Sequence, residues 1–427
     1  MKIKRFTASS QAGQEFLASA IKDIQEYEQR VQDIGKAIKA RGNEAIFEFT
    51  QRFDGASINA DNFRVSEAEI EAAYEAVDDD YIFAIQAASD NIAMFHSRQL
   101  RNSWMEPDER GNILGQVFRP LERVGIYVPG GTAAYPSSVL MNAIPAQVAG
   151  VEQIAMVTPP DQEGKLNPYT LVAAAELEIS EIYKMGGAQA IFGLAYGTQT
   201  IKKVDLISGP GNIYVTLAKK MVYGEVNIDM LAGPSEILII ADSNADPAYL
   251  AADMMSQAEH DVLARSILVC DDEKILDQVE TELEKQIASL SRRSIIEQSL
   301  QDYGALILVG DLVEACEVAN LVAPEHLELM VEHPFDLLSL IRNAGAIFMG
   351  KYTPEPVGDY YAGPNHILPT GGTARFYSPV TVDTFTKASS LLYYSPRGIA
   401  EDADDIIKLA TVEGLTAHAN SVRLRKG

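Results

Sequence analysis

The pattern of hydrophobic and polar positions changes its period near residue 123 of this chain. From about Ser9 to Leu100 the pattern is helical, and Ser66-Glu67-Ala68-Glu69 has the sequence of a capping box at a helix start. Trp104 to Arg119 then matches a β-hairpin that turns at Asp108 to Gly111. The first part of the chain therefore predicts helices followed by a hairpin.

Beyond Arg123 the pattern alternates between short β runs and helical stretches. This alternation is typical of βαβ units, in which the strands form a parallel sheet and the crossovers are right-handed. The strands fall into two series, so we expect two incomplete Rossmann-like α/β units that meet near Asp229 to Pro234. The predicted strands are 124–128, 154–158, 182–185, 204–207, 237–240, 267–270, 306–309, 327–330 and 347–349.

These patterns divide the chain into four segments. Residues 1–122 form a helical N-terminal region with the hairpin, which we expect to pack on the second α/β unit. Residues 123–234 form the first unit and residues 235–380 the second. The second unit ends in an irregular stretch from Gly350 whose tyrosines and polar clusters favour a functional loop. Residues 381–427 form a small helical C-terminal tail.

Length and charge narrow the class of protein. At 427 residues the chain exceeds the size at which a single core keeps growing, so at least two domains are expected. Lys and Arg total 35 against 60 Asp and Glu, and the net charge of −25 argues against nucleic acid and membrane surfaces as partners.

Cys270 and Cys316 form no C-x-x-C pair, so neither a disulfide framework nor a cysteine zinc site is expected. Without a signal-like stretch or a run of membrane-spanning length, the prediction is a cytoplasmic protein.

Candidate chemistry begins at the end of the stretch Ile228 to His260. Gln257 and His260 lie three apart in a helical pattern and therefore share a face, although a solvated helix end would explain this pair alone. With Asp359 and His418 they would supply two imidazoles, one carboxylate and one amide oxygen. This set suits zinc and also accepts manganese or cobalt, and its weak amide donor favours a site that a substrate can enter.

Glu325 and His326 form a second candidate pair. Neighbours in a strand point to opposite faces, so the two can share a site only where the chain bends, and Pro324 favours such an extended bend. A carboxylate and an imidazole could there divide the roles of base and acid, because histidine titrates near neutrality. A surface acidic–basic pair is the alternative. His96 and His333 have nothing distinctive around them, and we interpret both as structural or exposed.

A glycine-rich turn supplies the candidate nucleotide site. The run Gly209-Pro210-Gly211-Asn212-Ile213-Tyr214 follows a predicted strand and precedes a helix, which is the context for a phosphate at a helix N-terminus. Tyr214 stands where a dinucleotide-binding motif would have its third glycine, so a simple βα turn is an equal alternative. Pro129-Gly130-Gly131 is a second glycine turn at a strand end.

The run from Ile228 to His260, which contains Ala-Gly-Pro-Ser-Glu and Ser-Gln-Ala-Glu-His, resembles the signature of the histidinol dehydrogenases. The resemblance continues in RVGIYVPGG, MGGAQA and ISGPGN and spans roughly Arg123 to His418. It implies one zinc per subunit and NAD as cofactors, with Glu325 activating water and His326 shuttling protons. The implied zinc ligands are Gln257, His260, Asp359 and His418. The implied substrate contacts are Ser235, Gln257, His260, His326, Asp359, His366, Glu413 and His418. The implied NAD contacts are Tyr127, Gln189 and Asn212.

The same resemblance implies a reaction and an assembly. Histidinol dehydrogenases oxidise L-histidinol through the aldehyde to L-histidine with two NAD, in the last steps of histidine biosynthesis. The resemblance places the nucleotide on residues 123–234, most metal and catalytic residues on 235–380, and the tail 381–427 in the neighbouring subunit of a homodimer with shared active sites. Three alternatives stay open: a dehydrogenase for another small polar alcohol, a zinc hydrolase with Glu325 as its base, and a non-catalytic zinc-binding scaffold.

Overall fold

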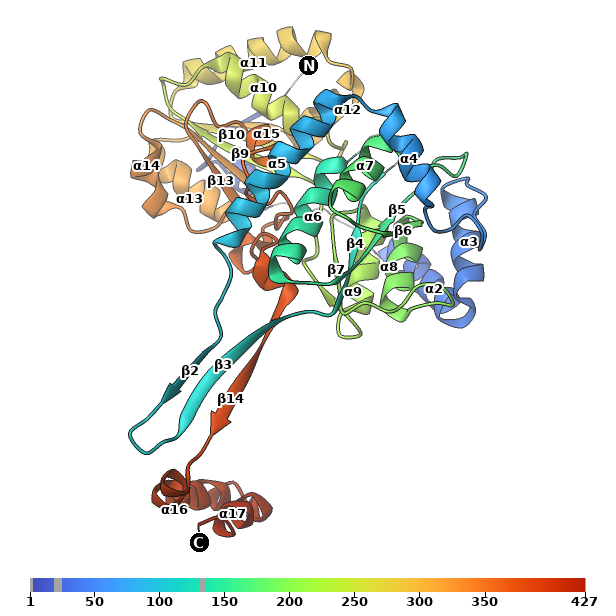
Figure 1. Ribbon diagram of the computed structural model, residues 1–427. Helices are drawn as coiled ribbons and strands as arrows, with labels where there is room; N and C mark the ends of the chain where they lie inside the picture. Colours follow the sequence, from blue (N-terminus) through green and yellow to red (C-terminus); the bar gives the residue numbers. More distant parts are fainter. Residues whose placement is uncertain (1–2, 19–24, 131–134, 427) are drawn as a thin grey trace.

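The computed structural model describes residues 3–18, 25–130 and 135–426 of the chain. Two parallel sheets covered by helices form the body, and a thin antiparallel arm extends away from it (Figure 1). The α/β class predicted from the sequence is confirmed, and each predicted strand corresponds to a strand of one of the two parallel sheets. In the described part of the chain, no helix is both long and apolar enough to cross a membrane.

The first sheet lies in the middle of the sequence. Its elements are β4 (Arg123–Tyr127), α6 (Pro136–Ala149), β5 (Gln153–Thr158), α7 (Pro168–Glu176), β6 (Glu181–Lys184), α8 (Gly187–Tyr196), β7 (Leu206–Ser208), α9 (Ile213–Val222) and β8 (Asn227–Ile228). The strand order is β6-β5-β4-β7-β8, and every neighbouring pair is parallel. The order reverses between β4 and β7, and ligands bind open α/β sheets at the carboxyl ends of the strands on either side of such a point.

The second sheet has the order β1-β11-β10-β9-β12-β13 and is also parallel throughout. Its strands are β1 (Lys4–Thr7), β9 (Glu236–Ala241), β10 (Arg265–Cys270), β11 (Ala305–Leu308), β12 (His326–Met330) and β13 (Ala346–Met349). Its helices are α1 (Gln11–Ala18), α10 (Pro247–Ala258), α11 (Glu273–Gln286), η1 (Ile287–Ser289), α12 (Arg293–Tyr303), α13 (Leu312–Val322), α14 (Pro334–Leu337), η2 (Leu338–Leu340) and α15 (Glu355–Tyr360). Every residue of β9 and β12 is buried, as expected where helices cover both faces of a parallel sheet.

The N-terminal region does not pack mainly on the second unit, so that prediction is wrong for most of it. The helices α2 (Gln25–Arg41) and α3 (Asn43–Phe53) contact α8, and α4 (Glu67–Ala76) and α5 (Asp79–Ser97) contact α7 and α6 of the first unit. Among the described elements of this region only β1 and α1 belong to the second unit, while Asn91 of α5 reaches it through a hydrogen bond to the Tyr361 carbonyl.

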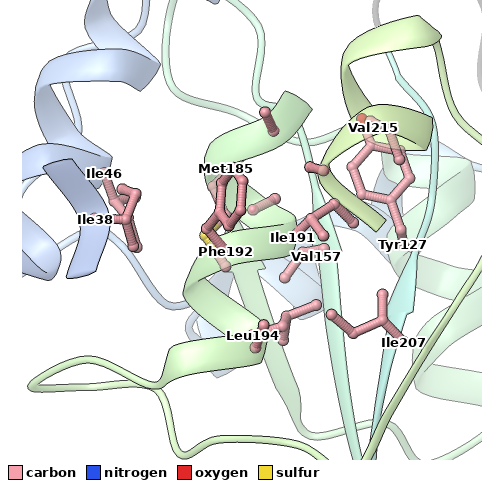
Figure 2. Packing of buried hydrophobic residues seen from close by; sticks show 14 of the residues in the cluster. Ile38, Ile46, Tyr127, Val157, Met185, Ile191, Phe192, Leu194, Ile207 and Val215 are labelled. Atoms are coloured by element: carbon pink, nitrogen blue, oxygen red, sulfur yellow. The ribbon is translucent and has the colours of Figure 1, made fainter. Parts of the chain in front are cut away.

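The core of the first unit explains this placement. Ile38 of α2 and Ile46 of α3 lie in one buried cluster with Ile191, Phe192 and Leu194 of α8, beside the sheet residues Val157 and Ile207 (Figure 2). Because both N-terminal helices and α8 bury apolar side chains in the same cluster, the helices cover one face of the first sheet. Amphipathic periodicity identifies the buried face of a helix, but it does not say which sheet that face will cover.

The arm is the antiparallel part of the structure. It consists of β2 (Trp104–Pro107), β3 (Ile113–Pro120) and β14 (Thr386–Tyr393) in the order β14-β3-β2. The predicted hairpin is therefore confirmed, but the prediction that 381–427 is a helical tail is wrong for its first part, because β14 pairs with β3 as a strand and α16 begins only at Pro396. The short helices η3 (Thr373–Arg375) and η4 (Val382–Phe385) precede the arm, and α16 (Pro396–Val412) and α17 (Thr416–Arg423) lie at its tip (Figure 1).

Candidate active site

The candidate acid–base pair lies at the amino end of the second sheet. His326 is the first residue of β12, and Glu325 directly precedes it. The chain bends before them, because Ala323 adopts a left-handed conformation at the end of α13 and Pro324 follows. This bend brings Glu325 Oε2 to 3.6 Å from His326 Nδ1, so the two side chains share one site.

A single residue, Glu236 at the start of β9, orients both members of the pair. Its backbone N–H donates to Glu325 Oε2 at 2.9 Å, and its carbonyl oxygen lies 3.1 Å from His326 Nδ1. Because a carbonyl can only accept, Nδ1 carries the hydrogen of this bond and the other ring nitrogen faces the site. His326 Nε2 makes no hydrogen bond within the described residues. The predicted substrate contact Ser235 is the residue before Glu236.

Burial and charge set the protonation of this pair. Burial raises the pKa of Glu325 to about 8, although the charge of His326 opposes the shift. Burial lowers the pKa of His326, but the carboxylates of Glu325, Asp359 and Glu355 outweigh it and raise that pKa to about 10. A cation bound beside Asp359 would oppose the pull of these carboxylates and return the imidazole towards its ordinary pKa.

Gln257 lies in the last turn of α10 with a side-chain amide that has no hydrogen-bond partner among the described residues. Its side chain is 0% exposed, and neither Oε1 nor Nε2 has a hydrogen-bond partner in the described part of the chain. A buried polar group left unpaired costs about 1–3 kcal/mol, so this amide points to a ligand that is not part of the chain. Burial lowers the pKa of His260, which keeps this imidazole neutral and able to bind a metal.

Asp359 on α15 joins these groups to the acid–base pair. Its Oδ1 lies 3.6 Å from His326 Nε2, and donor atoms of His326, Glu355 and Asp359 all lie within 4.8 Å of one another. The carbonyl of Asp359 accepts a hydrogen bond of 3.0 Å from His366 Nδ1, and its carboxylate charge acts on His260. This cluster shares only Asp359 with the predicted zinc ligands, and its nitrogen and oxygen donors are of the kind that zinc binds.

Two predicted site residues lie elsewhere in the chain. Glu413 follows α16 and His418 lies in α17, both are exposed, and both helices are at the tip of the arm (Figure 1). Gln257, His260 and Asp359 lie in the body of the molecule. The fold of one chain therefore does not bring the fourth predicted metal ligand to the other three.

The predicted nucleotide contacts surround the point where the strand order of the first sheet reverses. Tyr127 ends β4, and its hydroxyl accepts a hydrogen bond from the Gly187 N–H at 3.1 Å. Asn212 caps α9, because its Oδ1 accepts from the N–H groups of the first helical turn at 3.0 and 3.2 Å. Gln189 on α8 is 1% exposed, and neither atom of its amide is hydrogen-bonded by a described residue.

Gly209 allows the turn before α9 to approach β4 closely. Its φ of +126° lies in the region that favours glycine, and a Cβ there would lie 2.1 Å from the Tyr127 carbonyl oxygen. The buried pair of Lys219 and Asp229 holds the same turn, since Lys219 Nζ donates to the Gly209 carbonyl at 2.9 Å and the Gly209 N–H donates to Asp229 Oδ2 at 2.8 Å. The turn is therefore held rigidly in place.

One cavity connects the two halves of the site. Its volume is about 510 Å³, and its walls come from loops at the carboxyl end of the first sheet and at the amino end of the second. The lining residues are Tyr127, Pro129, Gly130, Tyr135, Gly211, Asn212, His260, Asp261, Val262, Arg292 and Ile295. The candidate nucleotide loops thus face the candidate metal ligand His260 across a space that can hold a small molecule.

Sequence reasoning missed a layer of buried carboxylates behind the site. Each lies one helical turn or two strand positions from a predicted site residue, so the periods of α10, β12 and α15 place it on the same face. That spacing was a usable signal in the sequence. The pairs are Asp253 with Gln257, Glu328 with His326, and Glu355 with Asp359.

A buried acid–base pair, the unpaired buried amide of Gln257 and a glycine-rich βα turn that faces His260 across a cavity indicate an α/β enzyme with a candidate metal site and a candidate nucleotide site. Comparison with known proteins gives the particular family. A family model described as histidinol dehydrogenase matches residues 17–426. The histidinol dehydrogenase of Heliobacterium mobile is 61% identical over 396 residues, which is 93% of each chain. That of Carboxydothermus hydrogenoformans is 54% identical over 401 residues, or 94% of each chain.

A solved structure agrees with these sequence matches. The crystal structure of histidinol dehydrogenase from Elizabethkingia anophelis superposes with a TM-score of 0.94 at 39% identity, covering 99% of this chain and 98% of that one. The chain therefore belongs to the histidinol dehydrogenase family, and it is an NAD-dependent oxidoreductase of histidine biosynthesis. The hydrolase, the scaffold and the dehydrogenase for another alcohol are not favoured by these matches.

Proposed function

We propose that the cavity between the two sheets is the place where this chain oxidises L-histidinol through the aldehyde to L-histidine, with two NAD reduced in succession. The observation that carries the proposal is the joint orientation of Glu325 and His326 by the backbone of Glu236, together with the unpaired buried amide of Gln257. The family match supplies the substrate, and this geometry supplies the groups that move protons.

His326 and Glu325 would serve the two oxidation steps in turn. In the first step His326 Nε2, which faces the site, accepts the hydroxyl proton as the alcohol carbon loses its hydride. In the second step Glu325 takes a proton from the water that adds to the aldehyde carbon, and the hydrate then loses its own hydride. Burial raises the pKa of Glu325 to about 8, so its ionised form is a stronger base than an ordinary carboxylate, and the ionised fraction grows as the pH rises through about 8.

We further propose that one zinc per subunit is held by Gln257, His260, Asp359 and the partner subunit's His418. The unpaired amide of Gln257 and the neutral imidazole of His260 support the set. When bound, the ion would supply a positive charge that holds the imidazole and amino nitrogens of the substrate in place. Ser235, His366 and the partner subunit's Glu413 would complete the substrate contacts.

For NAD we propose contacts with Tyr127, Gln189 and Asn212. Asn212 at the start of α9 and the unpaired buried amide of Gln189 support this assignment. NAD, when bound, accepts the hydrides that the substrate loses. The cavity lined by Tyr127 and Asn212 also reaches His260, so the nucleotide and the metal-bound end of the substrate can meet there.

A homodimer with shared active sites accounts for the arm. The arm carries a large set of exposed apolar side chains, which monomeric proteins rarely present together, and it ends in the exposed His418. We propose that the partner subunit covers this surface. The apolar residues are Trp104, Met105, Leu114, Leu392, Tyr393, Tyr394, Leu409, Val412, Leu415 and Leu424. We propose the cytoplasm as the location, in keeping with two buried cysteines that form no disulfide.

The test is the number of NADH molecules formed per L-histidinol consumed by zinc-loaded protein. Two NADH per histidinol are expected, and none from protein with NAD bound would contradict the proposed reaction. The variant Glu325→Gln should shift the ratio towards one, because the alcohol step needs His326 and the aldehyde step needs activated water. Equal losses of both steps in this variant would refute the division of roles between Glu325 and His326.

A further inference from the structure

Arg292 is the only lysine or arginine among the described residues that line the cavity. It stands on the wall built by the second unit, while Gly211 and Asn212 stand on the wall built by the first. We propose that the guanidinium of Arg292 binds a phosphate of the dinucleotide across the cavity from the Gly211–Asn212 turn. This assignment rests on the proposed binding of NAD in the same cavity, and it adds a contact from the opposite unit.

The guanidinium retains hydrogen-bonding capacity in its present position. Arg292 Nη2 donates to the backbone carbonyl of His260 over a long distance of 3.5 Å, and Nε is buried without a hydrogen-bond partner in the described part of the chain. Arginine carries five N–H donors in a planar fork, and a phosphate can accept two of them side by side. The contact with His260 therefore holds the side chain near the cavity while donors remain for an anion.

The surrounding backbone also favours an anion at this place. Arg292 precedes α12 and Ile295 lies in its first turn, and both line the cavity, so the positive end of the α12 dipole faces it. The side chain of Arg292, at the N-cap position, makes no capping hydrogen bond to this helix. Across the cavity, Asn212 marks the start of α9. Two helix N-termini and one guanidinium thus converge on one space in a chain whose net charge is −25.

The chemistry of the two ligands decides which one Arg292 serves. L-Histidinol is a cationic amino alcohol without an anionic group, so an arginine beside it would repel it. The pyrophosphate of NAD carries two negative charges, and the dinucleotide that contains it is long enough to reach both walls of the cavity. A phosphate held between Arg292 and the start of α9 would also tie the two α/β units together while NAD is bound.

The experiment compares Arg292→Gln with Arg293→Gln, a matched control. Arg293 adjoins Arg292 in the chain, but its Nε pairs with Glu297 at 2.8 Å on an exposed face. The dissociation constants of NAD, ADP-ribose and adenosine are measured by calorimetry on zinc-loaded protein without histidinol. Arg292→Gln should weaken NAD and ADP-ribose about 10-fold or more and leave adenosine unchanged, because a charged hydrogen bond to phosphate is lost. Arg293→Gln should bind all three as the wild type does.

Salt and the conservative variant sharpen the result. NAD affinity should fall with rising salt in the wild type and less steeply in Arg292→Gln, and Arg292→Lys should recover part of the loss because it keeps the charge without the fork. Equal NAD affinities for the two glutamine variants would overturn the assignment. So would a loss of zinc or of histidinol affinity in Arg292→Gln, which would show that Arg292 acts through the His260 carbonyl. Failure of the wild type itself to bind NAD would instead refute the proposed function.

Discussion

At the scale of single residues, the site depends on backbone groups as much as on side chains. The backbone N–H of Glu236 orients Glu325, and the backbone carbonyl of Glu236 orients His326. The tautomer of His326 is therefore decided by a residue ninety positions earlier in the chain. The side chain of Glu236 is itself buried and accepts a hydrogen bond from the Gly371 N–H at 2.8 Å. The loop after β13 thereby supports the strand end that orients the acid–base pair.

A residue-scale prediction concerns Asp54, at the end of α3. Burial raises its pKa from 3.8 to about 6, and its Oδ2 has no hydrogen-bond partner among the described residues. The folded state therefore holds this proton more tightly than the unfolded state, and the stability that the neutral form contributes is lost as the pH rises through about 6. The thermal midpoint of Asp54→Asn, compared with that of the wild type, should therefore be higher at pH 7.5 than at pH 5.

The matched control for this prediction is Asp61→Asn. Asp61 is exposed in the loop that follows α3. Its replacement should change the midpoint by similar small amounts at both pH values, because surface substitutions rarely alter stability by more than about 0.5 kcal/mol. A midpoint difference between wild type and Asp54→Asn that does not change with pH would contradict the raised pKa.

At the scale of secondary-structure elements, the candidate metal site depends on how β12 and α15 are joined. Glu328 on β12 is 1% exposed, and its Oε1 accepts a hydrogen bond of 2.9 Å from the Glu355 N–H at the start of α15. Burial raises the pKa of Glu328, and the nearby carboxylate charge of Asp253 on α10 raises it further. Glu328 thus connects the three elements that carry Gln257, His326 and Asp359.

This arrangement predicts different effects for two substitutions of Glu328. Glu328→Gln keeps an acceptor oxygen for α15 and should bind zinc nearly as the wild type does. Glu328→Leu removes the acceptor, so the zinc affinity should fall about 10-fold or more, the range seen when a supporting hydrogen bond behind a metal ligand is lost. Competition with a chelator of known affinity measures both. Wild-type zinc affinity in the leucine variant would show that Glu328 does not position Asp359.

At the scale of the whole molecule, the position of His418 decides how many chains one active site needs. The arm carries α16 and α17 away from the body (Figure 1). The apolar residues along it are exposed in a single chain. If the partner's arm completes each site, two inactive variants should restore activity when combined. His326→Asn and His418→Asn should then each disable every site in their own homodimers.

The mixed dimers provide the test. Co-refolding equal amounts of the two variants should recover about a quarter of wild-type activity, because half of the dimers are mixed and each has one site with both residues intact. A control mixture of His326→Asn with Glu325→Gln should recover nothing beyond its parents, since both residues come from the same chain. No recovery in the first mixture would mean that His418 serves its own chain or none.

Much of this architecture was predictable from local patterns. Alternating β runs and helices indicated two parallel sheets, and a bend at Pro324 indicated how Glu325 and His326 could share a site. The strand β1 was missed because its four residues are too short to show a period. The N-terminal helices were assigned to the wrong unit, since a hydrophobic stripe carries no information about the surface that covers it.

The sequence alone determined which side chains could do chemistry, because residue type, spacing and family motifs are properties of short stretches of chain. Tertiary structure alone decided which of them lie close together: it placed Asp359 beside His326 and close enough for its charge to act on His260, and it sent His418 to the end of an arm. It also brought Arg292 to face Asn212, two residues that no local pattern connects. The proximity of such residues depends on how whole sheets pack, and that packing is set by contacts between residues far apart in the chain.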